Sequence, residues 1–204
     1  MDISGLNMNL TNRENWVAVI GSREATPEEL NMAYLLGYEL IRQGYIVVSG
    51  LALGIDAKAH AGALARLKAM DNNDLYKYGR VVAIVNTPKN QPIYPSANRA
   101  LAKEIRTYGC ILHPYNTIAE SRTGFNQFKK RLIERDLILA KLCPKIIAVS
   151  DKEVISGGTR YAVHYGKHFG KEVYRLDSQG NYYLNPPTEY CNVNWKMEFD
   201  LDAI

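Results

Sequence analysis

The stretch VSGLALGID, residues 48–56, joins a short apolar run to a segment with the periodicity of a helix. Gly50 and Gly54 leave the backbone of this turn uncovered, so its amide groups and the amino end of the following helix can accept an anion. A strand, a glycine-rich turn and a helix in this order are typical of parallel α/β sheets. The turn therefore raises the question of what the chain places against it.

The rest of the chain repeats this alternation of strand and helix. Six runs rich in Val and Ile predict buried strands, at residues 16–21, 45–50, 80–86, 110–113, 145–150 and 172–176. Five segments between them have helical periodicity, at residues 26–44, 54–70, 96–109, 128–142 and 159–170. The pattern predicts a doubly wound, mostly parallel α/β sheet of the Rossmann-like type, with helices on both faces and a ligand site at the carboxyl ends of the strands.

Length and composition favour one globular domain. The chain has 204 residues, of which 47% are hydrophobic, enough to bury one core. We divide it into a lead-in of residues 1–14, a core of residues 15–178, and a tail of residues 179–204 that packs on the core as a cap or hairpin. The tail contains the aromatic stretch NYYLNPPTEYCNVNW, which either folds back or is covered in an assembly, and we expect a homodimer.

The sequence also indicates a cellular compartment. It begins without a signal sequence and contains no run approaching the ~20 apolar residues of a membrane helix, so we expect no membrane association. Its three cysteines are too far apart for a zinc site or a disulfide framework, and we interpret them as reduced thiols of a cytoplasmic protein. The net charge of +4 indicates a weak preference for anionic partners and does not identify nucleic acid.

Three turns that follow predicted strands carry the candidate phosphate-binding residues. They are Gly21, Ser22 and Arg23 after the first strand, Ser49, Gly50, Leu51, Gly54 and Asp56 after the second, and Ser156, Gly157, Gly158 and Thr159 after the fifth. Arg23 is a fixed cation suited to phosphate, although an ordinary arginine in solvent explains it equally well. Two turns with uncovered amides at one sheet edge favour an anion site over coincidence.

Two further residues and three absent motifs bear on chemistry. Asp56 either caps its helix or receives a ligand hydroxyl, and His60 either points to the site or fills the core, with the core interpretation favoured for an isolated histidine. The patterns GxGxxG, GxxxxGK[ST] and GxSxG are absent, and no histidine or lysine is spaced to activate a serine. We therefore expect binding rather than catalysis, with no metal and no cofactor.

Five segments together resemble one known family. They are VAVIGSREAT, GYIVVSGLALGIDAKAHAGAL, IYPSANRALAKEIRTYGCIL, RLIERDLILAKLCPKIIAVS and SGGTRYAVHYGKHFGKEVYRL. They resemble the Rossmann-like domain of the DprA (Smf) family of DNA-processing proteins, within a wider superfamily that includes the lonely-guy phosphoribohydrolases. The resemblance spans residues 15–177, and SGLALGIDAKAHAGAL is its most specific part. It implies a domain that binds single-stranded DNA through backbone contacts and, in full-length relatives, helps to load a recombinase.

The resemblance carries over residue by residue at four motifs. The matched positions are Gly21, Ser22 and Arg23 for GSR, Ser49, Gly50, Gly54, Ile55, Asp56 and His60 for SGxAxGID…H, Tyr94, Pro95 and Asn98 for YPxxN, and Arg135 for the first arginine of RNR. It implies that Arg23 and Arg135 hold phosphates and that Tyr94 or Phe128 stacks a base. The candidate contacts to nucleic acid are His60, Tyr94, Asn98, Phe128, Lys129 and Lys130.

The chain departs from the family pattern at the RNR stretch and in the domains that we expect. Asp136 and Leu137 stand where the family shows Asn-Arg, which places an acid beside the expected groove. The run Lys129–Arg131 either restores positive charge one turn earlier or forms a solvated helix face. We also expect neither the additional amino-terminal helical domain nor the carboxy-terminal winged helix of full-length relatives.

Three functions follow in order of preference. The first is a single-domain DprA-like protein that binds single-stranded DNA in DNA processing or recombination, with a recombinase as a candidate partner. The second is a sensor or sponge for a small nucleotide-derived ligand at the same glycine turns. The third is a nucleotide-processing enzyme, which is disfavoured because the hydrolase pattern PGGxGTxxE becomes SGGTRYAVH and loses its carboxylate.

Overall fold

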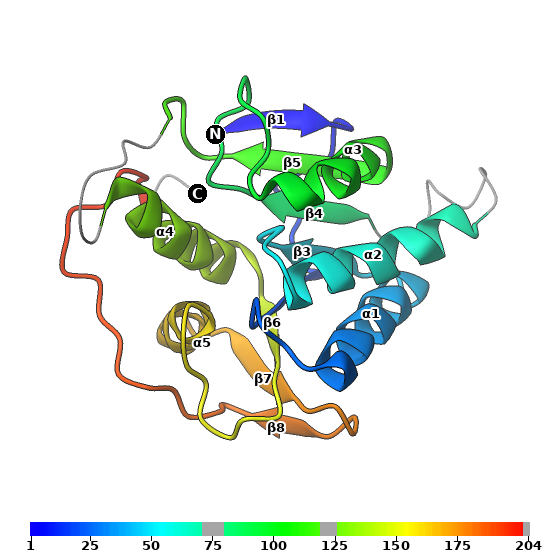
Figure 1. Cartoon of the computed structure of the whole chain (residues 1–204), viewed down its shortest axis with the longest axis vertical. Coiled ribbons are helices and arrows are strands. Elements are labelled where there is room, and N and C mark those ends of the chain that lie inside the picture. Colours follow the sequence, from blue (N-terminus) through cyan, green and yellow to red (C-terminus); the bar gives the residue numbers. More distant parts are fainter. Residues whose placement is uncertain (71–79, 119–125, 202–204) are drawn as a thin grey trace.

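One eight-stranded sheet in the order β1-β5-β4-β3-β2-β6-β7-β8 forms the centre of the molecule (Figure 1). The computed structural model describes residues 1–70, 80–118 and 126–201. The strands are β1 Asp2–Gly5, β2 Trp16–Gly21, β3 Ile46–Ser49, β4 Val81–Ile84, β5 Gly109–His113, β6 Lys145–Val149, β7 Glu172–Leu176 and β8 Tyr182–Leu184. The helices are α1 Pro27–Arg42, α2 Ile55–Lys68, α3 Arg99–Tyr108, α4 Gln127–Leu142 and α5 Thr159–His168, with a 3₁₀ turn at Ser96–Asn98.

Both faces of the central strands are buried, as the Val- and Ile-rich runs predict. Along β2, Val17 and Val19 face a core that includes side chains of α1, α2 and α3, whereas Ala18 and Ile20 face a second core with α4 and α5. Strands β2 to β7 are all parallel to one another. The predicted doubly wound sheet with helices on both faces is therefore confirmed.

The strand order reverses direction at β2. From β2 the chain places β3, β4 and β5 successively on one side, and then crosses through α4 to place β6 on the other side of β2. Val17 pairs with Val47 of β3 and with Lys145 of β6. In such sheets the crevice outside the carboxyl ends of the two strands at the reversal is the usual place for a ligand.

Helix α1 is tied to the loop after β6 by one buried carboxylate. Thr26 caps the helix, because its hydroxyl accepts the amide of Glu29 at 3.2 Å and Glu29 Oε2 accepts the amide of Thr26 at 2.8 Å. This is the reciprocal capping box that a Thr and a Glu three residues apart can form. The other oxygen of Glu29 accepts the amide of Asp151 at 2.8 Å. The cap therefore also positions one wall of the crevice.

Two edge strands and the tail complete the domain. Strand β1 pairs antiparallel with β5, and β8 pairs antiparallel with β7. Beyond β8 the tail runs past α5 to α4 (Figure 1), where Trp195 Nε1 and the amide of Glu198 donate to the buried carboxylate of Glu134. In the described parts of the chain, no helix is long and apolar enough to cross a membrane.

Candidate functional site

A cleft of about 690 Å³ opens at the point where the strand order reverses. Its walls include the turn after β2, the loops after β6 and the amino-terminal half of α4. The GSR turn of residues 21–23 and the SGGT turn of residues 156–159 both line this cleft. The structure thus brings together two turns that lie more than a hundred residues apart in the chain.

The GSR turn lies directly against the amino end of α2. Gly54 has φ +76°, and a Cβ atom there would overlap the carbonyl oxygens of Ser22 and Arg23. The amide of Ile55 donates to Ser22 O at 3.2 Å, and the Ser22 hydroxyl accepts the amide of Glu24 at 3.0 Å. The glycine of GID is therefore needed for packing, and it holds the GSR turn at the mouth of the cleft.

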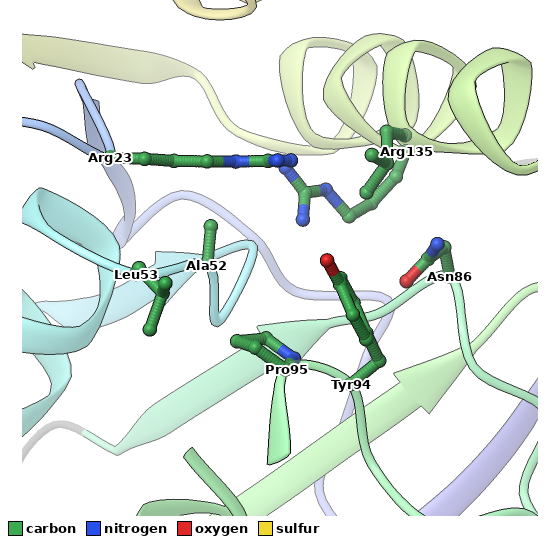
Figure 2. Close-up of a pocket in the computed structure, with 8 residues that line it drawn as sticks. Arg23, Ala52, Leu53, Asn86, Tyr94, Pro95 and Arg135 are labelled. Atoms are coloured by element: carbon green, nitrogen blue, oxygen red, sulfur yellow. The ribbon is translucent and has the colours of Figure 1, made fainter. Parts of the chain in front are cut away.

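Arg23 is the exposed cation of this turn. It lines the cleft, and no described residue forms a hydrogen bond with its guanidinium. Figure 2 shows the Arg23 side chain extending towards the guanidinium end of Arg135, so that two positive groups converge. An anion at Arg23 would gain charge-assisted hydrogen bonds from its guanidinium.

The SGLA turn of residues 49–52 is bound by a carboxylate of the chain itself. Asp56 Oδ2 accepts the amides of Gly50 at 3.1 Å and Ala52 at 3.3 Å. Asn98 Nδ2 donates to the carbonyl oxygens of Leu51 at 2.9 Å and Ala52 at 3.0 Å. Leu51 is buried and has φ +55°, an unfavourable conformation that this surrounding network maintains. Contrary to our expectation, the Gly50 and Ala52 amides are occupied within the chain.

Arg135 completes this network from the other side. Its Nη1 donates to Gly50 O at 2.8 Å and its Nη2 to Asp136 Oδ1 at 2.7 Å. A Cβ atom on Gly50 would overlap the guanidinium, which explains the glycine. Burial by itself lowers the pKa of Arg135, but Asp136 and Asp56 raise it above its ordinary value. Arg135 therefore braces the turn as a buried, compensated charge, whereas the sequence suggested a free phosphate-binding cation.

Three other motif residues face the interior and not the cleft. His60 is fully buried, with Nε2 3.1 Å from Val82 O, and burial lowers its pKa to about 4. The Ser49 hydroxyl donates to Val19 O at 2.6 Å. Asn98 is buried beneath the SGLA turn. The core interpretation favoured for His60 is therefore confirmed, and neither His60 nor Asn98 is positioned to contact nucleic acid, because both side chains are buried.

The SGGT turn remains open to the cleft. Gly157 and Gly158 are exposed, Gly157 has φ +62°, and α5 begins without a side-chain hydrogen bond to its first amides in the described structure. Asp136 faces this turn, since a Cβ atom on Gly158 would lie 3.9 Å from Asp136 Oδ2. Burial raises the pKa of Asp136, although Arg135 and Arg23 oppose that shift. The first amides of α5 and the Asp136 carboxylate, a hydrogen-bond acceptor, therefore lie close together at this turn.

A small side pocket of about 30 Å³ lies next to the cleft (Figure 2). Arg23 and Arg135 line both cavities, and Tyr94 stands at the pocket with 49% of its surface exposed. The ring of Tyr94 meets Phe128 edge to face, with centroids 4.9 Å apart. The two aromatic residues expected to stack a base are therefore neighbours. Sequence reasoning missed Asn86, which also lines the pocket and whose position after β4 was the available signal.

The basic run at the start of α4 divides into three environments. Lys129 is exposed and lines the cleft. The amine of Lys130 lies 5.9 Å from the ring centroid of Trp195 in the tail. Arg131 is fully buried, where it pairs with Glu198 at 2.7 Å. Lys129 therefore supplies positive charge at the cleft, in a chain where Leu137 replaces the family's second RNR arginine. Arg131 instead anchors the tail. Within the described ranges, no cluster of three or more His, Cys, Asp or Glu could hold a metal.

The fold and the cleft define a Rossmann-like α/β domain whose sequence lacks the dinucleotide and P-loop motifs. The sequence profile of the family described as DNA recombination-mediator protein A matches residues 4–188. The chain belongs to that family.

Curated relatives support this assignment. The chain is 28% identical to protein Smf of Synechocystis sp. over 163 residues, which cover 78% of this chain and 35% of the relative. It is 28% identical to DNA processing protein DprA of Bacillus subtilis over 172 residues, which cover 83% of this chain and 50% of the relative. The chain thus spans half or less of the length of these relatives.

Solved structures show the same fold. DNA processing protein A of Helicobacter pylori, described for its single-stranded DNA binding mode, aligns with a TM-score of 0.67 at 23% identity, covering 85% of this chain and 70% of that one. DprA of Streptococcus pneumoniae aligns with a TM-score of 0.66 at 25% identity, covering 85% of this chain and 53% of that one.

Proposed function

We propose that this domain binds single-stranded DNA through phosphate contacts and acts in DNA processing or recombination. The observation that carries the proposal is Arg23, an exposed guanidinium at the junction of the cleft and the side pocket. It stands near exposed Lys129 and the Tyr94–Phe128 pair. Cations that follow a backbone next to aromatic rings that stack bases are the usual combination for single strands. The single-stranded DNA binding described for the Helicobacter pylori protein supports the same ligand.

The chemistry of these contacts favours single strands with little sequence dependence from the phosphates. Guanidinium, ammonium and helix amides contact phosphate oxygens, which carry no base code. A flexible strand can follow a concave edge and turn a base onto Tyr94, whereas the bases of a duplex stay stacked. Affinity is expected to fall with salt, with a slope of about −0.7 for each phosphate neutralised.

The test is competition between a labelled oligonucleotide and its duplex at several salt concentrations. Arg23→Ala is expected to weaken single-strand binding roughly tenfold or more, because a charge-assisted hydrogen bond contributes about 1.5–3 kcal/mol. Arg42→Ala is the matched control, since Arg42 lies at the other end of α1 and pairs with Glu39. Equal affinity for single strand and duplex, or unchanged affinity in Arg23→Ala, would refute the proposal.

A small nucleotide-derived ligand is the second candidate. Asp136 favours it, because a carboxylate beside the open SGGT turn can accept a ligand hydroxyl or amino group while the turn holds a phosphate. The cleft of about 690 Å³ also lies within the usual size of small-molecule sites. Thermal stabilisation by mononucleotides, without binding of oligonucleotides, would select this function.

The domain is proposed to act by binding and not as an enzyme. The segment SGGTRYAVH has no carboxylate where the hydrolase pattern requires one. Release of free base from nucleoside monophosphates in proportion to protein concentration would contradict this. A homodimer and a recombinase partner belong to the same proposal and are testable by light scattering and by pull-down with a purified recombinase.

A further inference from the structure

Asp136 is a carboxylate of the cleft at a position where the family pattern has Asn. It lines the cleft, and its side chain is 13% exposed. Its Oδ1 accepts two hydrogen bonds from Arg135, from Nη2 at 2.7 Å and from Nε at 3.1 Å. No described residue donates to its Oδ2. One oxygen of a largely buried carboxylate therefore remains available at the cleft.

This oxygen lies beside the groups that are expected to bind a phosphate. Oδ2 is 3.9 Å from the position that a Cβ atom would take on Gly158, in the open SGGT turn. Arg23, the exposed cation of the GSR turn, is close enough to stabilise the charge of Asp136. A phosphate bound at Arg23 would thus have a carboxylate as its neighbour. A ligand that also offered a hydrogen-bond donor to Oδ2 would bind more tightly than one without such a donor.

The chemistry of the carboxylate restricts what that donor can be. The hydrogen bonds from the Arg135 guanidinium favour the ionised form of Asp136, which accepts hydrogen bonds only. Phosphodiesters and the deoxyribose within a DNA strand have no donor to offer. In a ribonucleotide, the 2′ hydroxyl is attached to the carbon next to the one that carries the 3′ phosphate, whereas the donors of a base lie on the far edge of its ring. A ribose hydroxyl therefore fits a carboxylate beside a phosphate site.

We propose that the Asp136 carboxylate accepts a hydrogen bond from the 2′ hydroxyl of a bound nucleotide, so that the cleft prefers a single strand with ribose to the same strand with deoxyribose. The inference rests on the proposed binding of single strands in this cleft and adds a sugar preference to it. The 2′ hydroxyl is the group by which a protein distinguishes RNA from DNA at a given site. Phosphate contacts from Arg23 and Lys129 are common to both strands and do not contribute to the preference.

The experiment compares three uridine strands of equal length, namely oligo-rU, oligo-dU and 2′-fluoro oligo-U. The three carry the same bases and the same charge, and only oligo-rU has a donor at the 2′ position. The 2′-fluoro strand keeps the sugar conformation of RNA, so it separates hydrogen bonding from the shape of the strand. The wild-type protein is expected to bind oligo-rU roughly tenfold more tightly than the other two, as one hydrogen bond to a charged group allows.

Two variants test Asp136 itself. Asp136→Ala is expected to bring the ratio of the oligo-rU and oligo-dU affinities near one. Asp136→Asn is expected to reduce the ratio to roughly threefold, because a neutral acceptor forms a weaker hydrogen bond than a carboxylate. Asn retains an acceptor for Arg135, which keeps the ratio measurable if the alanine variant fails to fold. A merely structural role of Asp136 would change both affinities and leave their ratio as in the wild type.

Lys129→Ala is the matched binding control. Lys129 also lines the cleft, and its removal is expected to weaken the binding of all three strands by the same factor. Equal wild-type affinities for oligo-rU and oligo-dU, a 2′-fluoro strand that binds as tightly as oligo-rU, or an unchanged ratio in the Asp136 variants would overturn the ribose contact. Arg23-dependent binding of oligo-dU would then leave the proposed function intact.

Two further outcomes separate this inference from the proposed function. Binding of oligo-rU without binding of oligo-dU would support the ribose contact and refute the proposed binding of DNA. Uridine 3′-monophosphate that displaces oligo-rU at equal nucleotide concentration would assign the contact to a free ribonucleotide and overturn the preference for a strand. Failure of the wild-type protein to bind any of the three strands would overturn both proposals.

Discussion

The SGLA and SGGT turns look alike in the sequence and differ in the structure. Both follow a parallel strand and precede a helix. In the SGLA turn, the Asp56 carboxylate accepts hydrogen bonds from the amides of Gly50 and Ala52, and Arg135 donates one to the Gly50 carbonyl. In the second, Gly157 and Gly158 are exposed to the cleft. A glycine-rich turn can therefore have its amides bonded to a buried carboxylate of the chain, or leave them open to an anion. The presence of buried charged side chains beside the turn determines which of the two occurs.

The largest expected difference between the SGLA and SGGT regions is the loss of stability when an arginine is replaced by alanine. Arg135→Ala leaves Asp56 and Asp136 buried without their cation, and it is expected to lower the free energy of unfolding by about 3–5 kcal/mol. Arg160→Ala, in the first turn of α5, removes a pair with the half-exposed Glu189 and is expected to cost about 1 kcal/mol or less. Urea denaturation of both variants measures the difference. Similar losses would show that the first turn is not braced by charge.

The second prediction concerns the pH dependence of stability that the buried His60 causes. Burial lowers the pKa of His60 from 6.5 to about 4, so between these values the unfolded chain binds more protons than the folded one. Stability is therefore expected to fall by roughly 3 kcal/mol as the pH drops through this window.

One variant isolates this contribution. His60→Gln is expected to flatten the pH dependence of unfolding in the window, relative to the wild-type protein. Urea midpoints measured from pH 6.5 to about 4 provide the slopes. An unchanged slope in His60→Gln would contradict burial of a neutral ring behind the first turn.

Glycine provides the smallest contrast and tests packing alone. Gly54 and Gly157 both have positive φ, at +76° and +62°, but a Cβ atom at Gly54 overlaps the GSR turn and one at Gly157 meets nothing within 4 Å. Gly157→Ala is expected to cost about 1 kcal/mol from backbone strain, and Gly54→Ala about 2 kcal/mol more. Thermal unfolding checks this. Equal costs would show that the GSR turn does not depend on close packing against α2.

Much of the fold was predictable because it depends on local patterns. The six predicted strands correspond to β2 to β7, since runs buried on both faces must be apolar throughout. Thr26 begins α1 as the capping pattern indicates. Strands β1 and β8 were missed because they are short edge strands, partly or wholly exposed, whose pairing with β5 and β7 supplies what their sequences lack.

The candidate site was predictable in place but not in the roles of its residues. The GSR and SGGT turns line one cleft because the carboxyl ends of parallel strands share an edge, a consequence of the alternation of strand and helix. That Arg135 is a brace and Arg23 a free cation depends on which guanidinium is buried among acids. Motif spacing does not distinguish these two roles, since Arg23 and Arg135 are both arginines of motifs that match the family.

The sequence by itself determined the doubly wound sheet, the edge that carries the cleft and the family. Hydrophobic periodicity and turn glycines act over a few residues, so they can be read locally. Only the tertiary structure decided that Asp56 fills the first turn, that Arg131 anchors the tail and that Asn86 lines the side pocket. These outcomes depend on desolvation and on hydrogen-bond partners from distant segments, which exist only after the chain has folded.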